Sequence, residues 1–214
     1  HFTPPVSWMN DPNGLIYYKG LYHLFYQYNP KSCEWGSMHW GHAVSKDLVN
    51  WEEKGIALYP TKTDDRSGCF SGSAVEQDGT MYLYYTGVNY LEEDPENINH
   101  CRNDQFLSAQ MMISSADGMT FDNLQEKKTI IPTIAEDKIG SKTHTRDPKV
   151  WRGTDAWYMV LGSSVANKGR LLIYQSRDLQ NWKYLSHVEK ENFGWMWECP
   201  DYFEVDGKGI TVFS

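Results

Sequence analysis

Ser45-Lys46-Asp47-Leu48-Val49-Asn50-Trp51 returns later in the chain as Ser176-Arg177-Asp178-Leu179-Gln180-Asn181-Trp182, and residues 115–121, Ser-Ala-Asp-Gly-Met-Thr-Phe, form a weaker third copy. Each copy combines a Ser-x-Asp turn with an aromatic residue that can anchor the strand after it. A short β-rich run precedes each copy, at residues 42–44, 110–113 and 171–174. The three copies therefore predict one structural unit that the chain uses repeatedly.

Hairpins complete these units. Four runs rich in aromatic and β-branched residues predict strands, at residues 21–28, 80–86, 156–161 and 210–213. Each run follows a polar turn with an Asp-Gly or Gly-rich pair, which is typical of β-hairpins; these turns lie at residues 18–20, 77–79, 152–155 and 205–209. We expect little helix, because no segment shows a long 3.6-residue apolar period. The acidic stretch from Asn89 to Gln105 predicts a solvated loop.

Tandem four-stranded units predict an all-β fold, a β-propeller whose blades surround a channel. The units start at Asp11, Ser71, Asp147 and Glu198, which are 60, 76 and 51 residues apart. With a mean spacing near 62, the 214 residues hold about three and a half units, whereas propellers typically have about four to eight blades. Residues 1–214 are therefore expected to form an incomplete propeller. A β-sandwich with coincidental repeats is the alternative.

The composition favours a sugar over a nucleic acid as partner. Twenty basic and 28 acidic residues give a formal net charge of −8, and 14% of the residues are aromatic. An acidic chain attracts nucleic-acid phosphates poorly, whereas aromatic rings stack on sugar C–H faces and carboxylates pair with hydroxyls. No run of about 18 apolar residues is present, so we expect no membrane span. The predicted partner is a small sugar, without nucleic acid or membrane.

The cysteines and histidines indicate neither a disulfide scaffold nor a metal site. Cys33, Cys69, Cys101 and Cys199 are scattered without CxxC spacing, which predicts reduced thiols in the core or near the site. The seven His form no metal-ligand pattern, and no Gly-rich phosphate loop is present, so we expect no metal and no cofactor. Because the chain begins with His1 rather than Met, its true start is expected upstream, and a targeting segment there stays open.

Three of the four unit starts carry a carboxylate. They are Asp11 in Trp8-Met9-Asn10-Asp11-Pro12-Asn13-Gly14, Asp147 in Arg146-Asp147-Pro148, and Glu198 in Trp197-Glu198-Cys199-Pro200-Asp201. Because the first strand of each blade lines the channel, these groups should converge at one mouth. Crowding should raise the pKa of at least one of them, while Arg146 offsets the repulsion and keeps Asp147 ionised. Each of these motifs, taken alone, could equally be an ordinary turn or the start of a strand. Because they occur at equivalent places in a repeat, a shared functional site is favoured.

The order of these motifs resembles glycoside hydrolase family 32, which contains invertases, sucrose-6-phosphate hydrolases and fructan hydrolases. The resemblance includes Phe70-Ser71-Gly72-Ser73 and covers essentially the whole chain. Residues 1–30 and 35–42 look most like the bacterial sucrose-6-phosphate hydrolase and invertase branch, which implies a cytoplasmic location. The family fold is a five-bladed propeller followed by a β-sandwich. The resemblance therefore implies that residues 1–214 are a partial catalytic propeller domain without the fifth blade and the sandwich.

The resemblance also implies a role for individual residues. Asp11 matches the family's nucleophile, Glu198 its acid/base, and Asp147 the carboxylate that holds two fructosyl hydroxyls and stabilises the transition state. The residues expected to bind substrate are Trp8, Met9, Asn10, Gln27, Trp35, Phe70, Ser71 and Arg146. Four tryptophans are expected to wall the pocket and to raise the pKa of Glu198 by desolvation, namely Trp8, Trp35, Trp195 and Trp197.

These roles imply a retaining hydrolase that cleaves the terminal β-D-fructofuranoside of sucrose or sucrose 6-phosphate through a covalent fructosyl-enzyme intermediate. Three alternatives stay open: a fructan β-fructosidase, a propeller glycosidase acting on arabinose-type furanosides, and a sugar-binding propeller without catalysis. An incomplete propeller leaves apolar blade faces uncovered. We therefore expect residues 1–214 to self-associate and to be a poor enzyme by themselves.

Overall fold

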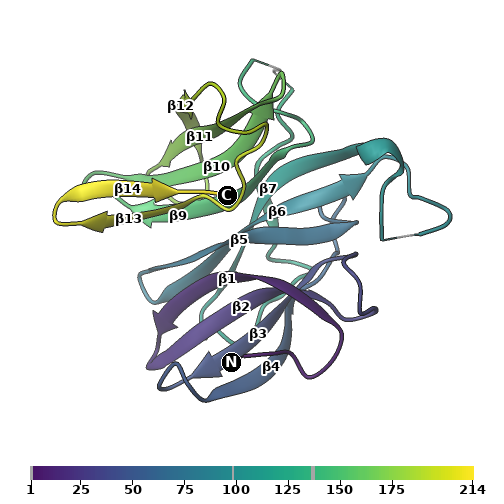
Figure 1. Cartoon of the computed structure of the whole chain (residues 1–214). Helices are drawn as coiled ribbons and strands as arrows, with labels where there is room; N and C mark the ends of the chain where they lie inside the picture. Colours follow the sequence, from purple (N-terminus) through teal and green to yellow (C-terminus); the bar gives the residue numbers. More distant parts are fainter. Residues whose placement is uncertain (1, 98, 136–137) are drawn as a thin grey trace.

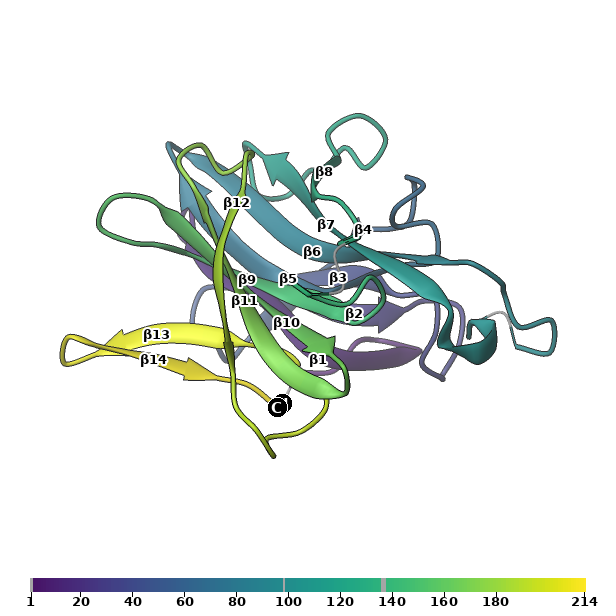
Figure 2. The same cartoon turned by 90° about the horizontal axis from the view of Figure 1, so that it is seen from above.

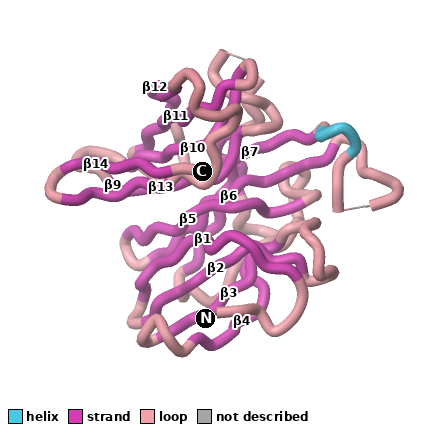
Figure 3. Tube along the Cα trace, in the orientation of Figure 1, coloured by secondary structure: helices cyan, strands magenta, loops and turns pink. Residues whose placement is uncertain are grey.

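Antiparallel strands form nearly all of the regular structure (Figure 1, Figure 3). The structure is a computed structural model that describes residues 2–97, 99–135 and 138–214, so His1 of the stretch 1–30 lies outside the described residues. The elements in chain order are β1 (Trp8–Tyr18), β2 (Leu21–Asn29), β3 (His39–Ser45), β4 (Trp51–Leu58), β5 (Gly68–Gln77), β6 (Thr80–Tyr90), the 3-10 helix η1 (Arg102–Asp104), β7 (Phe106–Ser115), β8 (Lys128–Ile131), β9 (Thr145–Arg152), β10 (Trp157–Val165), β11 (Lys168–Ser176), β12 (Lys183–Glu189), β13 (Asp201–Val205) and β14 (Lys208–Val212).

The strands form consecutive meanders. β1–β4, β5–β8 and β9–β12 each make a four-stranded sheet in chain order, and β13–β14 make a two-stranded sheet. Figure 1 shows the sheets following one another from the N-terminal to the C-terminal end of the chain, and Figure 2 shows the same arrangement from above. The prediction of about three and a half propeller blades is confirmed by this topology. The four predicted strand runs also lie almost wholly within β2, β6, β10 and β14.

The hairpin turns form where the polar pairs predicted them. Asp78 and Gly79 both have positive φ, 52° and 76°, between β5 and β6, and the Asp206–Gly207 turn between β13 and β14 repeats this geometry. Two successive left-handed residues make a type I′ turn, whose twist matches that of the flanking strands. Asp and Gly tolerate this conformation better than most residues. The local chemistry of these pairs therefore sets the register of each hairpin.

The repeated Ser-x-Asp segment is a hydrogen-bonded turn between the third and fourth strands of a blade. In the first copy, the Asp47 carboxylate accepts from the backbone N–H groups of Val49 and Asn50 at 2.9 and 2.7 Å, and the Ser45 hydroxyl donates to Asp47 at 3.0 Å. Asp117 and Asp178 make the same bonds in the other two copies. The side-chain amide of Asn181, which has the largest effect on Asp178, and the backbone donors lower the pKa of these Asp residues well below its usual value. The repeat is therefore structural, and it closes each blade.

The innermost strands bring the unit starts together. β1 contacts β5, β5 contacts β9, and β9 contacts β13, so the first strands of successive blades lie side by side near the centre in Figure 1. Apolar clusters fill the space between neighbouring sheets. Trp40 and Tyr85 meet in the first cluster, and Tyr84 and Leu161 meet in the second, all with exposures of 1% or less. Each such side chain contributes roughly 1.5–3 kcal/mol by burial, so the blades hold the central strands in fixed positions.

A buried ion pair lies beside the connection from the first blade to the second. Lys127 Nζ lies 2.6 Å from Asp65 Oδ2, and both side chains are fully buried. The Asp65 carboxylate also accepts from the Tyr85 hydroxyl at 2.8 Å and from the Thr61 and Lys62 backbone N–H groups. Removing one partner of such a pair typically costs about 3–5 kcal/mol, because the other charge stays buried. The pair therefore fixes the start of β5 and, through it, Phe70 and Ser71.

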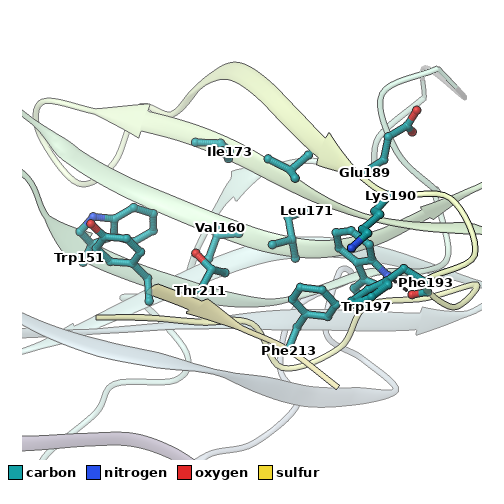
Figure 4. Close-up of a pocket in the computed structure, with 12 residues that line it drawn as sticks. Trp151, Val160, Leu171, Ile173, Glu189, Lys190, Phe193, Trp197, Thr211 and Phe213 are labelled. Carbon is teal, nitrogen blue, oxygen red and sulfur yellow. Dashed lines mark hydrogen bonds between the residues drawn. The ribbon is translucent and has the colours of Figure 1, made fainter. Parts of the chain in front are cut away.

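An apolar hollow lies between the third blade and the β13–β14 hairpin (Figure 4). Trp197 stacks on Phe213 with ring centroids 4.2 Å apart, and Trp151 stacks on Tyr202 at 4.3 Å. Val160 and Leu171 form the floor on the side of the third blade. Among the described strands, only β13 and β14 pack on this face of the third blade, so part of the face stays uncovered. Within the described ranges, no helix combines the length and the apolar character that a membrane crossing requires.

Candidate active site

Each innermost strand of the three complete blades carries a β-bulge at the same level. Residues 10–11 of β1 face the single residue Gln27, residues 70–71 of β5 face Thr86, and residues 147–148 of β9 face Leu161. A bulge places two residues opposite one, bends the strand and redirects a side chain, and bulges are frequent beside active sites. The bulges thus turn Asp11, Ser71 and Asp147 toward the channel.

One cavity of about 550 Å³ contains all three predicted catalytic carboxylates. Asp11, Asp147 and Glu198 line it together with six of the eight residues expected to bind substrate. These six are Asn10, Gln27, Trp35, Phe70, Ser71 and Arg146. The expected convergence at one mouth is therefore confirmed. A cavity of this size suits a ligand of one or two sugar rings.

Short polar contacts hold Asp11. The Ser71 hydroxyl donates to Asp11 Oδ2 at 2.6 Å, and the Cys199 thiol lies 3.7 Å from the same oxygen. These contacts leave Asp11 Oδ1 without a hydrogen-bond partner among the described residues. Ser71 belongs to the second blade and Cys199 to the segment before β13, so three blades fix this carboxylate. Its orientation depends on the propeller and not on the first blade alone.

Asp147 is the most constrained of the three carboxylates. It is only 6% exposed, its φ is +63°, and it precedes Pro148. Left-handed φ is uncommon for a non-Gly residue, and a residue before Pro normally adopts extended backbone, so this position is strained. The Thr86 hydroxyl accepts from the Asp147 N–H at 3.0 Å, and the Cys199 N–H donates to Asp147 Oδ2 at 2.8 Å. The second and fourth blades therefore hold the strained residue in place.

Burial raises the pKa of Asp147 to about 6 from its ordinary value of 3.8. The charge of Arg146 and the Cys199 N–H oppose this shift, whereas Glu198 and Asp11 add to it by repulsion. The expected raised pKa thus occurs, and desolvation contributes more to it than crowding. Arg146 offsets the repulsion as expected, because its charge lowers the pKa of Asp147, and with a pKa of about 6 Asp147 is ionised at neutral pH. Arg146 acts on Asp147 through its charge, because its side-chain hydrogen bonds go to Glu198 and His144.

Arg146 and Glu198 form an ion pair across the cavity. Arg146 Nε donates to Glu198 Oε1 at 3.1 Å, and Nη2 donates to the same oxygen. The Glu198 backbone pairs with Ser214 through two hydrogen bonds of 2.9 and 3.0 Å, which fixes its position at the mouth. The Glu198 side chain is 48% exposed, so one of its oxygens is open to the cavity.

The tryptophan wall expected around Glu198 is only half present. Trp35 and Trp195 line the cavity, but Trp8 and Trp197 do not. Trp197 is turned into the apolar hollow, where it stacks on Phe213, because the contact between blades buries more of its ring. Trp8 and Met9 line a separate shallow hollow near Cys33. Trp8 Nε1 donates to Asn10 Oδ1 at 2.9 Å. Trp8 therefore orients Asn10, which lines the cavity, although Trp8 itself does not.

The remaining predicted contact residues are anchored by their neighbours. Gln27 donates from Nε2 to the Cys69 carbonyl at 2.9 Å. Its side-chain carbonyl oxygen has no hydrogen-bond partner among the described residues and can accept from a ligand. The rings of Trp35 and Phe70 meet edge to face at 5.7 Å. Trp40 Nε1 donates to the Phe70 carbonyl at 2.9 Å and fixes the bulge from the core. These contacts give one side of the cavity an aromatic wall next to amide groups.

Several residues of the cavity wall were not predicted from the sequence. The sequence predicts the connection from β6 to β7 only as a solvated loop, yet this connection supplies wall residues, and the segment before β9 supplies His144. The wall residues without a predicted place at the site are Tyr90, His100, Asp104, Phe106, His144 and Ser214, and Cys101 and Cys199 join them as thiols with no predicted role there. The Glu-Cys-Pro motif was the available signal for Cys199, but its backbone role was not visible in the sequence.

The four cysteines are free thiols, as predicted. Cys69 is buried in the core, and Cys101 and Cys199 line the cavity, as expected, but Cys33 is exposed and lines the separate shallow hollow instead. Among the described residues, no group of three or more His, Cys, Asp or Glu side chains is placed to hold a metal ion.

Comparison with known proteins adds to this geometry. Residues 1–214 match the N-terminal domain of glycosyl hydrolases family 32. The chain is 41% identical to a sucrose-6-phosphate hydrolase of Escherichia coli and 42% identical to a raffinose invertase of Escherichia coli, in each case over 100% of this chain and 43% of the relative. A β-fructofuranosidase of Bombyx mori, solved as a mutant in complex with sucrose, superposes with a TM-score of 0.84 at 41% identity, over 100% of this chain and 42% of that chain. The chain thus spans less than half the length of these relatives.

Proposed function

Because the chain belongs to glycosyl hydrolase family 32, we propose that it carries the catalytic residues of a β-fructofuranosidase that hydrolyses sucrose or sucrose 6-phosphate. The names of the relatives support this reaction. The single observation that carries the proposal is the cavity where Asp11, Asp147 and Glu198 meet from three different blades. A sugar-binding propeller would need no such set of three carboxylates, one of them strained and desolvated.

In the proposed first step, Asp11 attacks the anomeric carbon of the fructosyl unit. The bond from this carbon to the leaving oxygen breaks as Glu198 gives that oxygen its proton, so the leaving sugar departs as a neutral alcohol. The transition state resembles an oxocarbenium ion, and the negative charge of Asp11 stabilises it. The Ser71 hydroxyl, at 2.6 Å from Oδ2, leaves Oδ1 as the oxygen that can form the covalent bond.

In the second step, Glu198, now ionised, takes a proton from a water molecule as that water attacks the anomeric carbon. The bond to Asp11 breaks, and fructose leaves with its original configuration. The open oxygen of Glu198 suits both proton transfers, because Arg146 donates to the other oxygen. Such a change from acid to base on one residue is how retaining glycosidases complete the cycle.

We propose that Asp147 binds two hydroxyls of the fructosyl ring. Its buried carboxylate is prearranged by the Thr86 hydroxyl and the Cys199 N–H, so little reorganisation is needed during the reaction. Hydrogen bonds to a carboxylate are about twice as strong as neutral ones. Asp147 therefore stabilises the transition state when its contacts with the ring tighten.

Hydrolysis assays with the full natural chain test this function. Release of fructose from sucrose or from sucrose 6-phosphate is the expected result. Inulin as the much better substrate would favour the fructan β-fructosidase alternative, and hydrolysis of arabinofuranosides alone would overturn the proposal. Binding of sucrose without any turnover would support the sugar-binding alternative instead.

Asp147→Asn should lower kcat by roughly 10²–10³-fold while KM changes much less, because the lost contacts are strongest in the transition state. The pKa of about 6 also predicts a pH effect. The ionised form is present above pH 6 and is lost as the pH falls through 6, so kcat/KM of the wild type should fall there. The variant should lack this acid limb. Steady-state kinetics on sucrose between pH 4 and 8 measure both effects.

Thermal unfolding is the control for Asp147→Asn. Since the folded pKa lies above 3.8, the ionised Asp147 carboxylate destabilises the folded state above pH 6, and this cost disappears below pH 3.8. The Asn variant should therefore be at least as stable as the wild type at pH 8. An effect confined to KM would show that Asp147 only binds the ground state.

Self-association of residues 1–214 stays a prediction. The apolar hollow and the exposed Val188, Phe193 and Val212 beside it, each about half exposed, are the surface on which it would occur.

A further inference from the structure

The inference concerns the leaving-group side of the cavity and rests on the proposed function. His144 lies on this side: its ring packs edge-on against Trp195 at 5.1 Å and Phe106 at 5.6 Å, and Arg146 Nη1 lies 3.4 Å from its Nδ1. Asp104 and His144 line this cavity and an adjacent hollow together, and Arg146, which contacts His144, pairs with Glu198. Asp104 therefore lies on the same side of the cavity as Glu198, where the acid must meet the leaving oxygen.

Carboxyl groups outnumber cations in this cavity. Asp11, Asp104, Asp147 and Glu198 line it, and among its described lining residues Arg146 alone is a Lys or Arg. Arg146 is engaged by Glu198. Arg102, two residues before Asp104, is paired with Glu92 at 2.7 Å. Among the described residues that line the cavity, no Lys or Arg is thus free of a carboxylate.

His144 does not supply a positive charge near neutral pH. Burial and the charge of Arg146 lower its pKa below 6.5, and the opposing effects of Asp104 and Glu198 are smaller. A neutral imidazole can still donate one hydrogen bond to a sugar hydroxyl. A phosphate group, by contrast, carries a charge of about −1.5 to −2 at pH 7 and needs cations or several donors.

We propose that Asp104 is a specificity-determining residue that makes this site select a neutral leaving sugar, as in sucrose, over a phosphorylated one, as in sucrose 6-phosphate. Asp104 is exposed at the mouth and makes no ion pair among the described residues, so its charge faces an entering substrate. Like charges that are brought together across an interface weaken the binding of the wrong partner, here a phosphorylated sugar. A neutral glucosyl unit meets no such repulsion.

Lys142 is a nearby cation that offers a competing explanation. It is exposed and lines an adjacent hollow that shares Asp104 and His144 with the cavity. If a phosphate group reached over this boundary, Lys142 would bind it and would favour sucrose 6-phosphate. Replacing Lys142 therefore separates the two possibilities.

The test compares kcat/KM for sucrose and sucrose 6-phosphate in the full natural chain at low salt. We expect a preference for sucrose of about tenfold or more, which corresponds to about 1.4 kcal/mol. Asp104→Asn should reduce this preference by roughly three- to tenfold, and the matched variant Asp104→Glu should keep it, because the charge is what discriminates. Raising the salt concentration should narrow the preference in the wild type but less in Asp104→Asn. Lys142→Ala should leave the ratio unchanged.

The outcomes separate this inference from the proposed function. Better hydrolysis of sucrose 6-phosphate, an unchanged ratio in Asp104→Asn, or a loss of sucrose 6-phosphate hydrolysis in Lys142→Ala would each overturn the inference and leave the function standing. Hydrolysis of neither substrate would overturn the proposed function and, with it, the inference.

Discussion

Asp11→Asn should abolish sucrose hydrolysis, with a loss in kcat of roughly 10⁴-fold or more, the scale typical of removing a nucleophile. An amide is a far weaker nucleophile than a carboxylate and has no negative charge to stabilise the oxocarbenium-like transition state. The substitution keeps the shape of the side chain, and the amide oxygen can still accept from the Ser71 hydroxyl. The expected loss in kcat therefore results from the missing nucleophile and not from misfolding. Steady-state rates of glucose release from sucrose measure it.

Asp155→Asn is the matched control for this variant. Asp155 is exposed in the turn between β9 and β10, away from the cavity, and accepts a hydrogen bond from the Tyr158 hydroxyl. The control should retain nearly full activity. If Asp11→Asn also kept a rate near that of the wild type while folded, Asp11 would not be the nucleophile.

Glu198→Gln should lower sucrose turnover by about 10²–10⁴-fold, the usual contribution of a general acid. The loss should depend on the leaving group. Fluoride departs without a proton, so fructosyl fluoride should react in the first step at nearly the wild-type rate. Gln keeps an oxygen that can accept from Arg146, which preserves the local geometry. Rapid-quench measurements of fluoride release against glucose release from sucrose test the difference.

Equal losses on both substrates would contradict an acid role for Glu198. Such a result would mean that the residue binds or orders the sugar but transfers no proton.

The fold was predictable because its signals are local. The Ser-x-Asp turns form through hydrogen bonds within five residues, and the Asp-Gly turns follow from backbone preferences of those two residues. Each signal carries its meaning without tertiary context. The spacing of these turns along the chain predicts the number of blades. The equivalent places of Asp11, Asp147 and Glu198 at the start of a repeat predict that these carboxylates lie together.

The rest of the site was not predictable, because it depends on contacts between blades. The strained φ of Asp147 is held by Thr86 and Cys199, which are 61 residues before it and 52 after it. Trp197 adjoins Glu198 in sequence, yet its ring lies in the apolar hollow and stacks on Phe213, which is a contact with the β13–β14 hairpin segment. Asp104 lies in a polar loop with no motif, and only the folding of that loop over the cavity gives it a role. Arg146 likewise neighbours Asp147 but pairs with Glu198.

Trapping the fructosyl-enzyme tests the central claim most directly. In Glu198→Gln, fructosyl fluoride should form the covalent intermediate quickly, whereas hydrolysis of that intermediate lacks its general base and should be slow. Mass spectrometry of the quenched protein should then show one added fructosyl unit, and peptide mapping should locate it on Asp11. A protein without an adduct that releases sugar of inverted configuration, or an adduct on another residue such as Asp147, would contradict the account.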